Sequence, residues 1–81
     1  MENRIAVLAV IIDKYEAVET VNALLHEYRD HIVGRMGIPY RQKNVNIISV
    51  VLDAPAEILN GLSGKLGMID GVSSKVLTAK R

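Results

Sequence analysis

The feature that most constrains this chain is an unbroken run of eight apolar residues, Ile5 to Ile12, between Arg4 and Asp13. Successive side chains of a strand point to opposite faces of the sheet, so a strand here would be apolar on both faces. A chain of 81 residues has enough helix to cover one face of a small sheet, but hardly two. The sequence therefore predicts that a partner covers the second face, most simply another copy of the chain.

Length and composition predict one small domain, residues 1–81, that gains stability from association. Chains of this size bury only about 60% of their unfolded surface and are marginal as monomers. The chain has no cysteine, which excludes disulfides and thiolate metal sites. We therefore expect a homo-oligomer, either a dimer or a tetramer.

Charge and hydropathy argue against several other classes of protein. Ten basic and nine acidic residues nearly cancel, whereas nucleic-acid binders usually show a strong basic bias. The apolar run is too short to span a bilayer, and its acidic flanks, Glu2 and Asp13, do not fit a signal peptide. We expect a cytoplasmic protein that contacts neither nucleic acid nor membrane directly.

The first half of the chain reads as strand, helix, strand. Residues 4–13 form the first strand. A helix follows, because apolar residues recur at steps of three and four, at Val18, Val21, Leu24, Leu25 and Tyr28. Residues 31–40 form the next strand, and Pro39 places it at a sheet edge because proline has no N–H to donate.

The second half reads as strand, helix, strand. Residues 45–53 form a β-branched strand, after which Asp53 offers a helix cap and Pro55 fits the first helical turn. Gly67 is placed to end this second helix, and residues 72–79 form the last strand. The predicted fold is a ferredoxin-like (βαββαβ) α+β sandwich, with a four-stranded antiparallel sheet of order 4-1-3-2 and both helices on one face.

The end of the second helix resembles the closing helix-to-strand signature of ACT-type regulatory domains. The residues that carry this resemblance are Leu62, Leu66, Ile69, Gly71 and Val72. The resemblance implies a domain that binds small effectors at subunit interfaces, commonly near the first strand–helix loop. That loop often carries glycine in the family, whereas this chain has Asp13-Lys14-Tyr15 there.

A more specific resemblance covers essentially the whole chain. Its motifs are Gly34-Arg35-Met36-Gly37-Ile38-Pro39-Tyr40, His26-Glu27-Tyr28, Val45-Asn46-Ile47-Ile48-Ser49 and Gly64-Lys65-Leu66-Gly67. With these, the chain resembles small stand-alone proteins described as regulators of iron-only hydrogenase systems. Their fold is ACT-like, akin to the C-terminal domain of the nickel-responsive repressor.

The resemblance implies a non-enzymatic regulatory module of an iron-only hydrogenase system. It would sense a small ligand at a subunit interface and act through a protein partner. The alternative is a homo-oligomeric assembly or scaffold protein without a ligand, serving metalloenzyme maturation. The sequence identifies no cofactor, and no serine has a histidine–carboxylate relay beside it, so we expect no enzymatic activity.

Two residue sets are candidates for binding. His26 and His31 are the chain's only histidines, and a metal would need them to converge outside one helix or across subunits, because five residues turn a helix by about 140°. Arg35, with open backbone at Gly34 and Gly37, is the candidate for an anionic ligand. Arg35, Arg41 and Lys43 form a basic cluster that is either part of such a site or a solvated hairpin tip.

The segment Gly61-Leu62-Ser63-Gly64-Lys65 is not a nucleotide site. It lacks the spacing of a phosphate-binding loop. It resembles the GxxG loop of KH domains, but a helix should follow that loop, and here a strand does. The two glycines instead predict close packing of the second helix on its sheet or on a neighbour.

Overall fold

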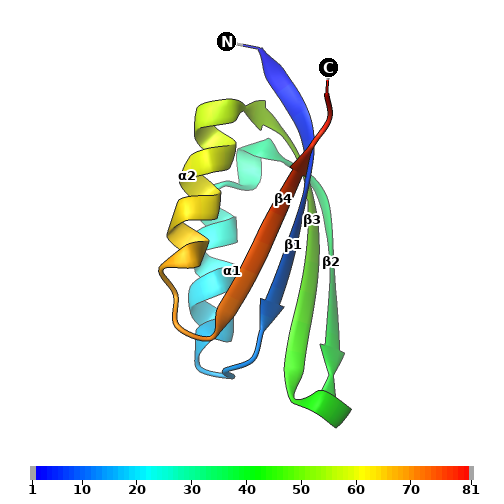
Figure 1. The fold of residues 1–81 in the computed structure, drawn as a ribbon, viewed down its shortest axis with the longest axis vertical. Coiled ribbons are helices and arrows are strands. Elements are labelled where there is room, and N and C mark those ends of the chain that lie inside the picture. The colour runs from blue at the N-terminus through cyan, green and yellow to red at the C-terminus, as the bar shows by residue number, and fades with distance from the viewer. Residues whose placement is uncertain (1, 81) are drawn as a thin grey trace.

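The computed structural model describes residues 2–80 and contains one four-stranded antiparallel sheet and two α-helices (Figure 1). In chain order the elements are β1 (Asn3–Ile12), α1 (Ala17–Glu27), the 3₁₀ turn η1 (Arg29–His31), β2 (Ile32–Tyr40), the 3₁₀ turn η2 (Arg41–Lys43), β3 (Val45–Pro55), α2 (Ala56–Gly67) and β4 (Val72–Thr78). The order of elements confirms the prediction from the sequence.

The sheet has the order β2-β3-β1-β4, which confirms the predicted arrangement with β1 and β3 in the centre. β1 pairs with β3 from Asn3–Pro55 to Ile12–Asn46, and with β4 from Ala6–Thr78 to Ile12–Val72. β2 lies at an edge, so Pro39 occupies a strand that has one neighbour. Figure 1 shows both helices on the same side of this sheet.

The core lies between the sheet and the helices. Every second residue from Ala6 to Ile12 in β1 and from Ile48 to Ala54 in β3 is buried there, as the alternation of strand side chains requires. The first helix contributes the apolar stripe that the sequence predicts, and α2 contributes Leu59, Leu62 and Leu66. The fully buried large side chains are Leu8, Val10, Ile12, Val21, Leu25, Val50, Leu52, Leu62 and Leu66.

The start of α2 corrects one prediction. Asp53 does not cap the helix, because β3 continues to Pro55 and Asp53 pairs with Ile5 inside the sheet. Pro55 is the extended residue before the helix rather than a member of its first turn, and α2 has no side-chain cap. Gly67 ends α2 as predicted, although only Gly71 among the described glycines adopts a positive φ.

The loop before α1 and the loop after α2 are joined at the lower end of the sheet in Figure 1. The backbone N–H of Asp13 donates to the carbonyl of Gly71 over 2.8 Å, and the Lys14 ammonium pairs with the Asp70 carboxylate at 2.5 Å. Gly71 has a φ of 84°, and a Cβ there would lie 2.6 Å from the Cβ of Lys14. The loops therefore meet closely only because residue 71 has no side chain.

The other face of the sheet is not covered by any described element. We call it the open face. Seven of the ten large hydrophobic residues that are exposed in the described chain lie on it: Ile5, Val7, Ile11, Met36, Ile38, Tyr40 and Leu77. Leu77 is 73% exposed and Val7 is 41% exposed. This confirms that β1 is apolar on both faces.

The start of β1 and the end of β4 lie at the same end of the sheet, where the N–H of Ala79 donates to the carbonyl of Ile5 over 2.9 Å (Figure 1). Neither helix within residues 2–80 is long and apolar enough to cross a bilayer.

A candidate ligand-binding trough at the hairpin end

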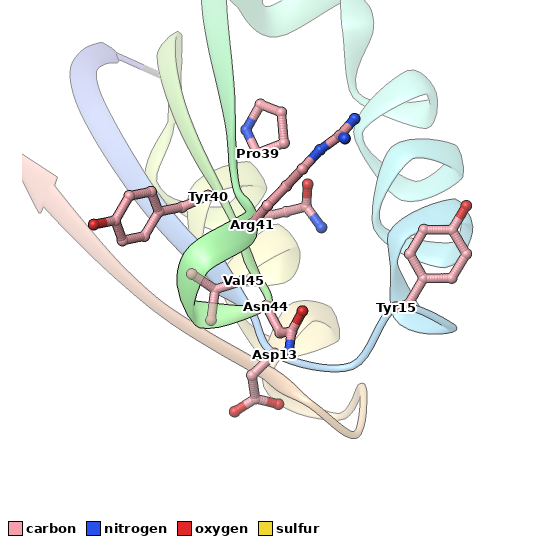
Figure 2. A pocket seen from close by; sticks show the side chains of 8 residues that line it. Asp13, Tyr15, Pro39, Tyr40, Arg41, Asn44 and Val45 are labelled. Atoms are coloured by element: carbon pink, nitrogen blue, oxygen red, sulfur yellow. The ribbon is translucent and has the colours of Figure 1, made fainter.

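The helices leave part of β2 uncovered on their own side of the sheet, and two adjoining hollows lie there. The larger hollow, of about 350 Å³, is bounded by the loop after β1 and the β2–β3 hairpin (Figure 2). The smaller one, of about 220 Å³, lies between α1 and β2. Both are lined by Pro39 and Asn46, so they adjoin, and we call the two together the hairpin trough.

Arg35 bridges the smaller part of the hairpin trough. It pairs with Val50 in the sheet register, and Val50 is buried under the helices, so Arg35 projects to the helix side. Its guanidinium donates to the Oδ1 of Asn22 in α1 over 2.7 Å. A guanidinium carries five N–H donors, so this single bond leaves most of them available to a ligand.

Arg41 and Tyr15 flank the larger part of the hairpin trough. In Figure 2 the Arg41 side chain extends from the hairpin towards α1, and Tyr15 lies across from it beside the start of that helix. Asp13 supplies one carboxylate to the lining. With Arg35, the trough holds two guanidinium groups against one carboxylate, so its net charge is positive.

The hairpin divides neighbouring residues between the two faces of the sheet. Tyr40 and Arg41 both line the hairpin trough, but the ring of Tyr40 points to the other side of the hairpin in Figure 2, and its hydroxyl donates to the Oε1 of Gln42 over 2.9 Å. Tyr40 is paired with Val45 at the end of the sheet and is 42% exposed on the open face. One turn therefore connects the trough to the open face.

The residues proposed for a ligand site from the sequence fall on two faces. Gly37 pairs with Ile48 and lines the hairpin trough beside Arg35, with open space where a Cβ would stand. Gly34 pairs with Val51 and lies on the open face, away from Arg35. Lys43 is exposed in η2 and does not line the trough, so the basic cluster contributes Arg35 and Arg41 to it.

The two histidines lie near the far end of α1. His26 is exposed in the last turn of the helix, and His31 has left the helix for η1, as convergence of the two would require. Across residues 2–80 no group of three or more His, Cys, Asp or Glu side chains is placed to hold a metal ion. A site shared between subunits stays a prediction.

Sequence reasoning missed the polar residues that complete the trough. Asn22 follows the buried Val21 in α1, and Asn46 pairs with Pro39 and with Ile12. The sequence did contain a signal for this site. Val18 and Asn22 are four residues apart and lie on one helical face, so the apolar stripe gives way to a polar residue on that face. Only the sheet order shows that this face borders an uncovered edge strand.

Of the two glycines expected to allow close packing of the second helix, Gly61 does so and Gly64 does not. A Cβ at Gly61 would lie 3.4 Å from the Tyr28 hydroxyl, so this glycine lets α2 approach the end of α1, where Lys65 also stands 5.2 Å from the centre of the Tyr28 ring. Gly64 has open space around it. One of the two glycines therefore serves close packing.

The fold and the closing turn define a class of protein. A sheet of order β2-β3-β1-β4 with both helices on one face is ferredoxin-like, and its closure through Leu66, Ile69 and the left-handed Gly71 is ACT-like. The profile of the TM1266-like family matches residues 4–76, and the chain belongs to that family. The family is described as an iron-only hydrogenase system regulator, with that assignment given as provisional.

One solved structure agrees with this membership, and a second one shares the fold alone. The uncharacterised protein TM1266 from Thermotoga maritima has a TM-score of 0.93 and 39% identity, and the match covers 98% of this chain and 100% of that one. The C-terminal domain of MgtC from Mycobacterium tuberculosis matches with a TM-score of 0.71 at 16% identity, over 98% of this chain and 90% of that one.

A formyltetrahydrofolate deformylase from Pseudomonas putida KT2440 shares the fold alone. Its TM-score is 0.68 at 17% identity, over 95% of this chain and 29% of that enzyme. No curated protein matches the chain.

Proposed function

We propose that this chain is a non-enzymatic regulatory module of an iron-only hydrogenase system that senses a small anionic ligand in the hairpin trough of a homo-oligomer. The observation that carries the proposal is the hairpin itself. It carries Arg41, which lines the positively charged trough, next to Tyr40, which borders the same trough and is also exposed on the uncovered apolar face. The family description supports the regulatory role.

The charge of the hairpin trough supports an anion. Guanidinium groups form strong, charge-assisted hydrogen bonds with carboxylates and phosphates. Arg35 is held by Asn22, and the amide of Asn46 adds neutral donors and acceptors nearby. A ligand with one or two carboxylate or phosphate groups would satisfy these side chains.

The hairpin offers a route from the ligand to the assembly. A ligand shifts an equilibrium only if it binds the two states with different affinity. A ligand that contacts Arg41 favours one position of the hairpin, and the same hairpin sets the position of Tyr40 on the open face. Binding would thereby change how subunits associate, and a protein partner would detect that change.

The rival function is that of a ligand-free scaffold in metalloenzyme maturation. The uncovered apolar face favours association in either case, so it does not separate the two functions. Ligand binding separates them, because only the regulatory module would bind a ligand. The proposal places the protein in the cytoplasm without direct contact to nucleic acid, in keeping with its near-zero net charge.

The test is a binding titration with defined anions. Inorganic phosphate, succinate and citrate are titrated by calorimetry into wild-type protein and into the Arg35→Ala variant. We expect at least one probe to bind, and Arg35→Ala to weaken it roughly 10–100-fold, because charge-assisted hydrogen bonds are worth about 1.5–3 kcal/mol. At ~100-fold excess over the dissociation constant, the same probe should raise the melting temperature by roughly 10 °C.

The control is Arg4→Ala. Arg4 is also an exposed arginine in a strand, but it pairs with Ala54 in the sheet and does not line the trough. Its removal should leave affinity unchanged. Equal loss in both variants would show non-specific charge attraction, and no binding by any probe would favour the scaffold.

A further inference from the structure

The open face carries two charged side chains among its apolar residues. Of the strand residues described on this face, only Asp53 in β3 and Lys75 in β4 are charged at neutral pH. Both are exposed. The register places Asp53 beside Ile5 and Lys75 beside Ala9, so they stand on opposite sides of β1.

Their positions are symmetrical about Val7. Val7 pairs with Val51 on one side and with Leu77 on the other. Asp53 is displaced from Val7 by one strand and two residues in one direction, and Lys75 by one strand and two residues in the opposite direction. With strands about 4.8 Å apart and about 3.3 Å per residue, each lies about 8 Å from Val7.

The two charges are therefore about 16 Å apart in one chain, which is too far for an ion pair. The described chain contains one salt bridge, that of Lys14 and Asp70, and neither Asp53 nor Lys75 takes part in it. A charge of each sign on an otherwise apolar surface needs an external partner if that surface is to be buried, because burying an unpaired charge is costly.

We infer that the open face binds a second copy of this chain face to face, with the two-fold axis over Val7 and with Asp53 of each copy paired with Lys75 of the other. This inference rests on the homo-oligomer in the proposed function and specifies its interface. The axis lies between the two sheets, parallel to them, passes over Val7 and is perpendicular to the line that joins Asp53 and Lys75. Rotation by 180° about this axis places Asp53 of one copy opposite Lys75 of the other. Both ion pairs then form at once, as an isologous interface requires.

The remaining geometry fits this arrangement. Packed sheets lie about 10 Å apart, a gap that a lysine and an aspartate reaching from opposite sides can close. For a flat sheet the symmetry sets the strands of the two copies at about 70°, near the perpendicular class of sheet packing. A shallow hollow of about 230 Å³ beside Lys75, between Ile11 and Ser73, remains open to a side chain of the other copy.

The test is charge reversal followed by mixing. Asp53→Lys and Lys75→Asp are each expected to weaken dimerisation at least tenfold at ~50 mM salt, because each places like charges opposite one another in both pairs. An equimolar mixture of the two variants is expected to form a heterodimer of near wild-type affinity, because every pair is again opposite in sign. Sedimentation equilibrium measures the affinities, and fluorescence energy transfer between labelled variants reports the mixed species.

Controls keep the outcomes separate. Circular dichroism checks that each variant is folded, and Glu57→Lys makes the same charge change at the exposed start of α2, where no effect is expected. This interface is overturned if neither charge reversal weakens dimerisation, or if mixing the two variants does not restore it. Either outcome leaves the ligand-sensing proposal to its own binding test. A folded wild-type monomer at ~100 μM overturns both this interface and the homo-oligomer.

Discussion

Gly71 is a single residue on which the meeting of two loops depends. Its φ of 84° is a conformation that costs a residue with a side chain about 1–2 kcal/mol. The close approach of Lys14 adds a steric cost, because its Cβ and Cγ stand 2.6 and 2.7 Å from the position that a Cβ would take.

We therefore expect Gly71→Ala to lower the free energy of unfolding by about 2–3 kcal/mol, from backbone strain together with displacement of Lys14. Urea denaturation measures the change. The matched control is Gly64→Ala, in an exposed position of α2 with nothing within 4 Å, where alanine should stabilise the helix by up to ~1 kcal/mol. Equal effects at the two positions would show that the loop contact has no special importance.

Single-residue predictions from the sequence succeeded where one local rule applied. Pro39 lies in an edge strand because its missing N–H restricts it, and Gly71 lies in the turn before the last strand because of its backbone freedom. The prediction that Asp53 caps the second helix was wrong because two local rules competed. A cap before Pro55 and a place in the strand are both compatible with the sequence, and pairing with Ile5 extends the strand.

At the scale of elements, the loops after β1 and after α2 act as one unit. Lys14 and Asp70 form an exposed ion pair, and the adjacent bond from Asp13 to Gly71 holds the two backbones together. The hydrogen bond to Asp70 and its negative charge raise the pKa of Lys14 above its ordinary value of 10.5. The hydrogen bond from Lys14 and its positive charge lower the pKa of Asp70 below its ordinary value of 3.8.

These shifts predict how the pair responds to pH. The lowered pKa of Asp70 adds stability that is present above pH 3.8 and is lost as the pH falls through the folded-state value. The raised pKa of Lys14 adds stability that is present below pH 10.5 and is lost as the pH rises through its folded-state value. A double-mutant cycle with Lys14→Ala and Asp70→Ala should therefore give a small coupling that is constant between about pH 5 and pH 9.

Salt provides the control for this cycle. Because the pair is exposed, ~0.5 M sodium chloride should reduce the coupling substantially at neutral pH. A coupling that survives high salt or changes near pH 7 would mean that a group other than these two is responsible.

The elements themselves were largely predictable, and the hairpin trough was not. Apolar periodicity identified the first helix, proline and glycine punctuation bounded the second, and the apolar run at residues 5–12 and the β-branched segment at residues 45–53 identified the central strands. The trough joins Asn22 of α1, Arg35 of β2 and Asp13 of a loop, which lie far apart in sequence. Their proximity depends on which edge strand the helices leave uncovered, a property of packing that no local pattern contains.

At the scale of the whole molecule, the proposed homo-oligomer predicts that stability depends on protein concentration. Burying a large aliphatic side chain contributes about 1.5–3 kcal/mol, and seven large hydrophobic residues are exposed on this face. In the proposed homo-oligomer, a subunit of 81 residues would therefore gain a large part of its stability from the copy that covers them.

We expect the melting temperature to rise by roughly 3–5 °C for each tenfold increase in protein concentration, because association favours the folded state by mass action. Differential scanning calorimetry between ~2 and ~200 μM measures this, with sedimentation equilibrium on the same samples. A melting temperature independent of concentration, together with a folded monomer at ~1 μM, would contradict the homo-oligomer.

The position of the two chain ends has a practical consequence for engineering. β1 begins and β4 ends at the same end of the sheet, whereas the hairpin trough lies at the opposite end, near the pairing of Ile12 with Asn46 (Figure 1). A flexible glycine–serine tether from the last strand of one copy to the first strand of the next would leave both troughs free. Such a tandem polypeptide would fix the subunit ratio covalently and allow one trough to be altered while its twin stays intact.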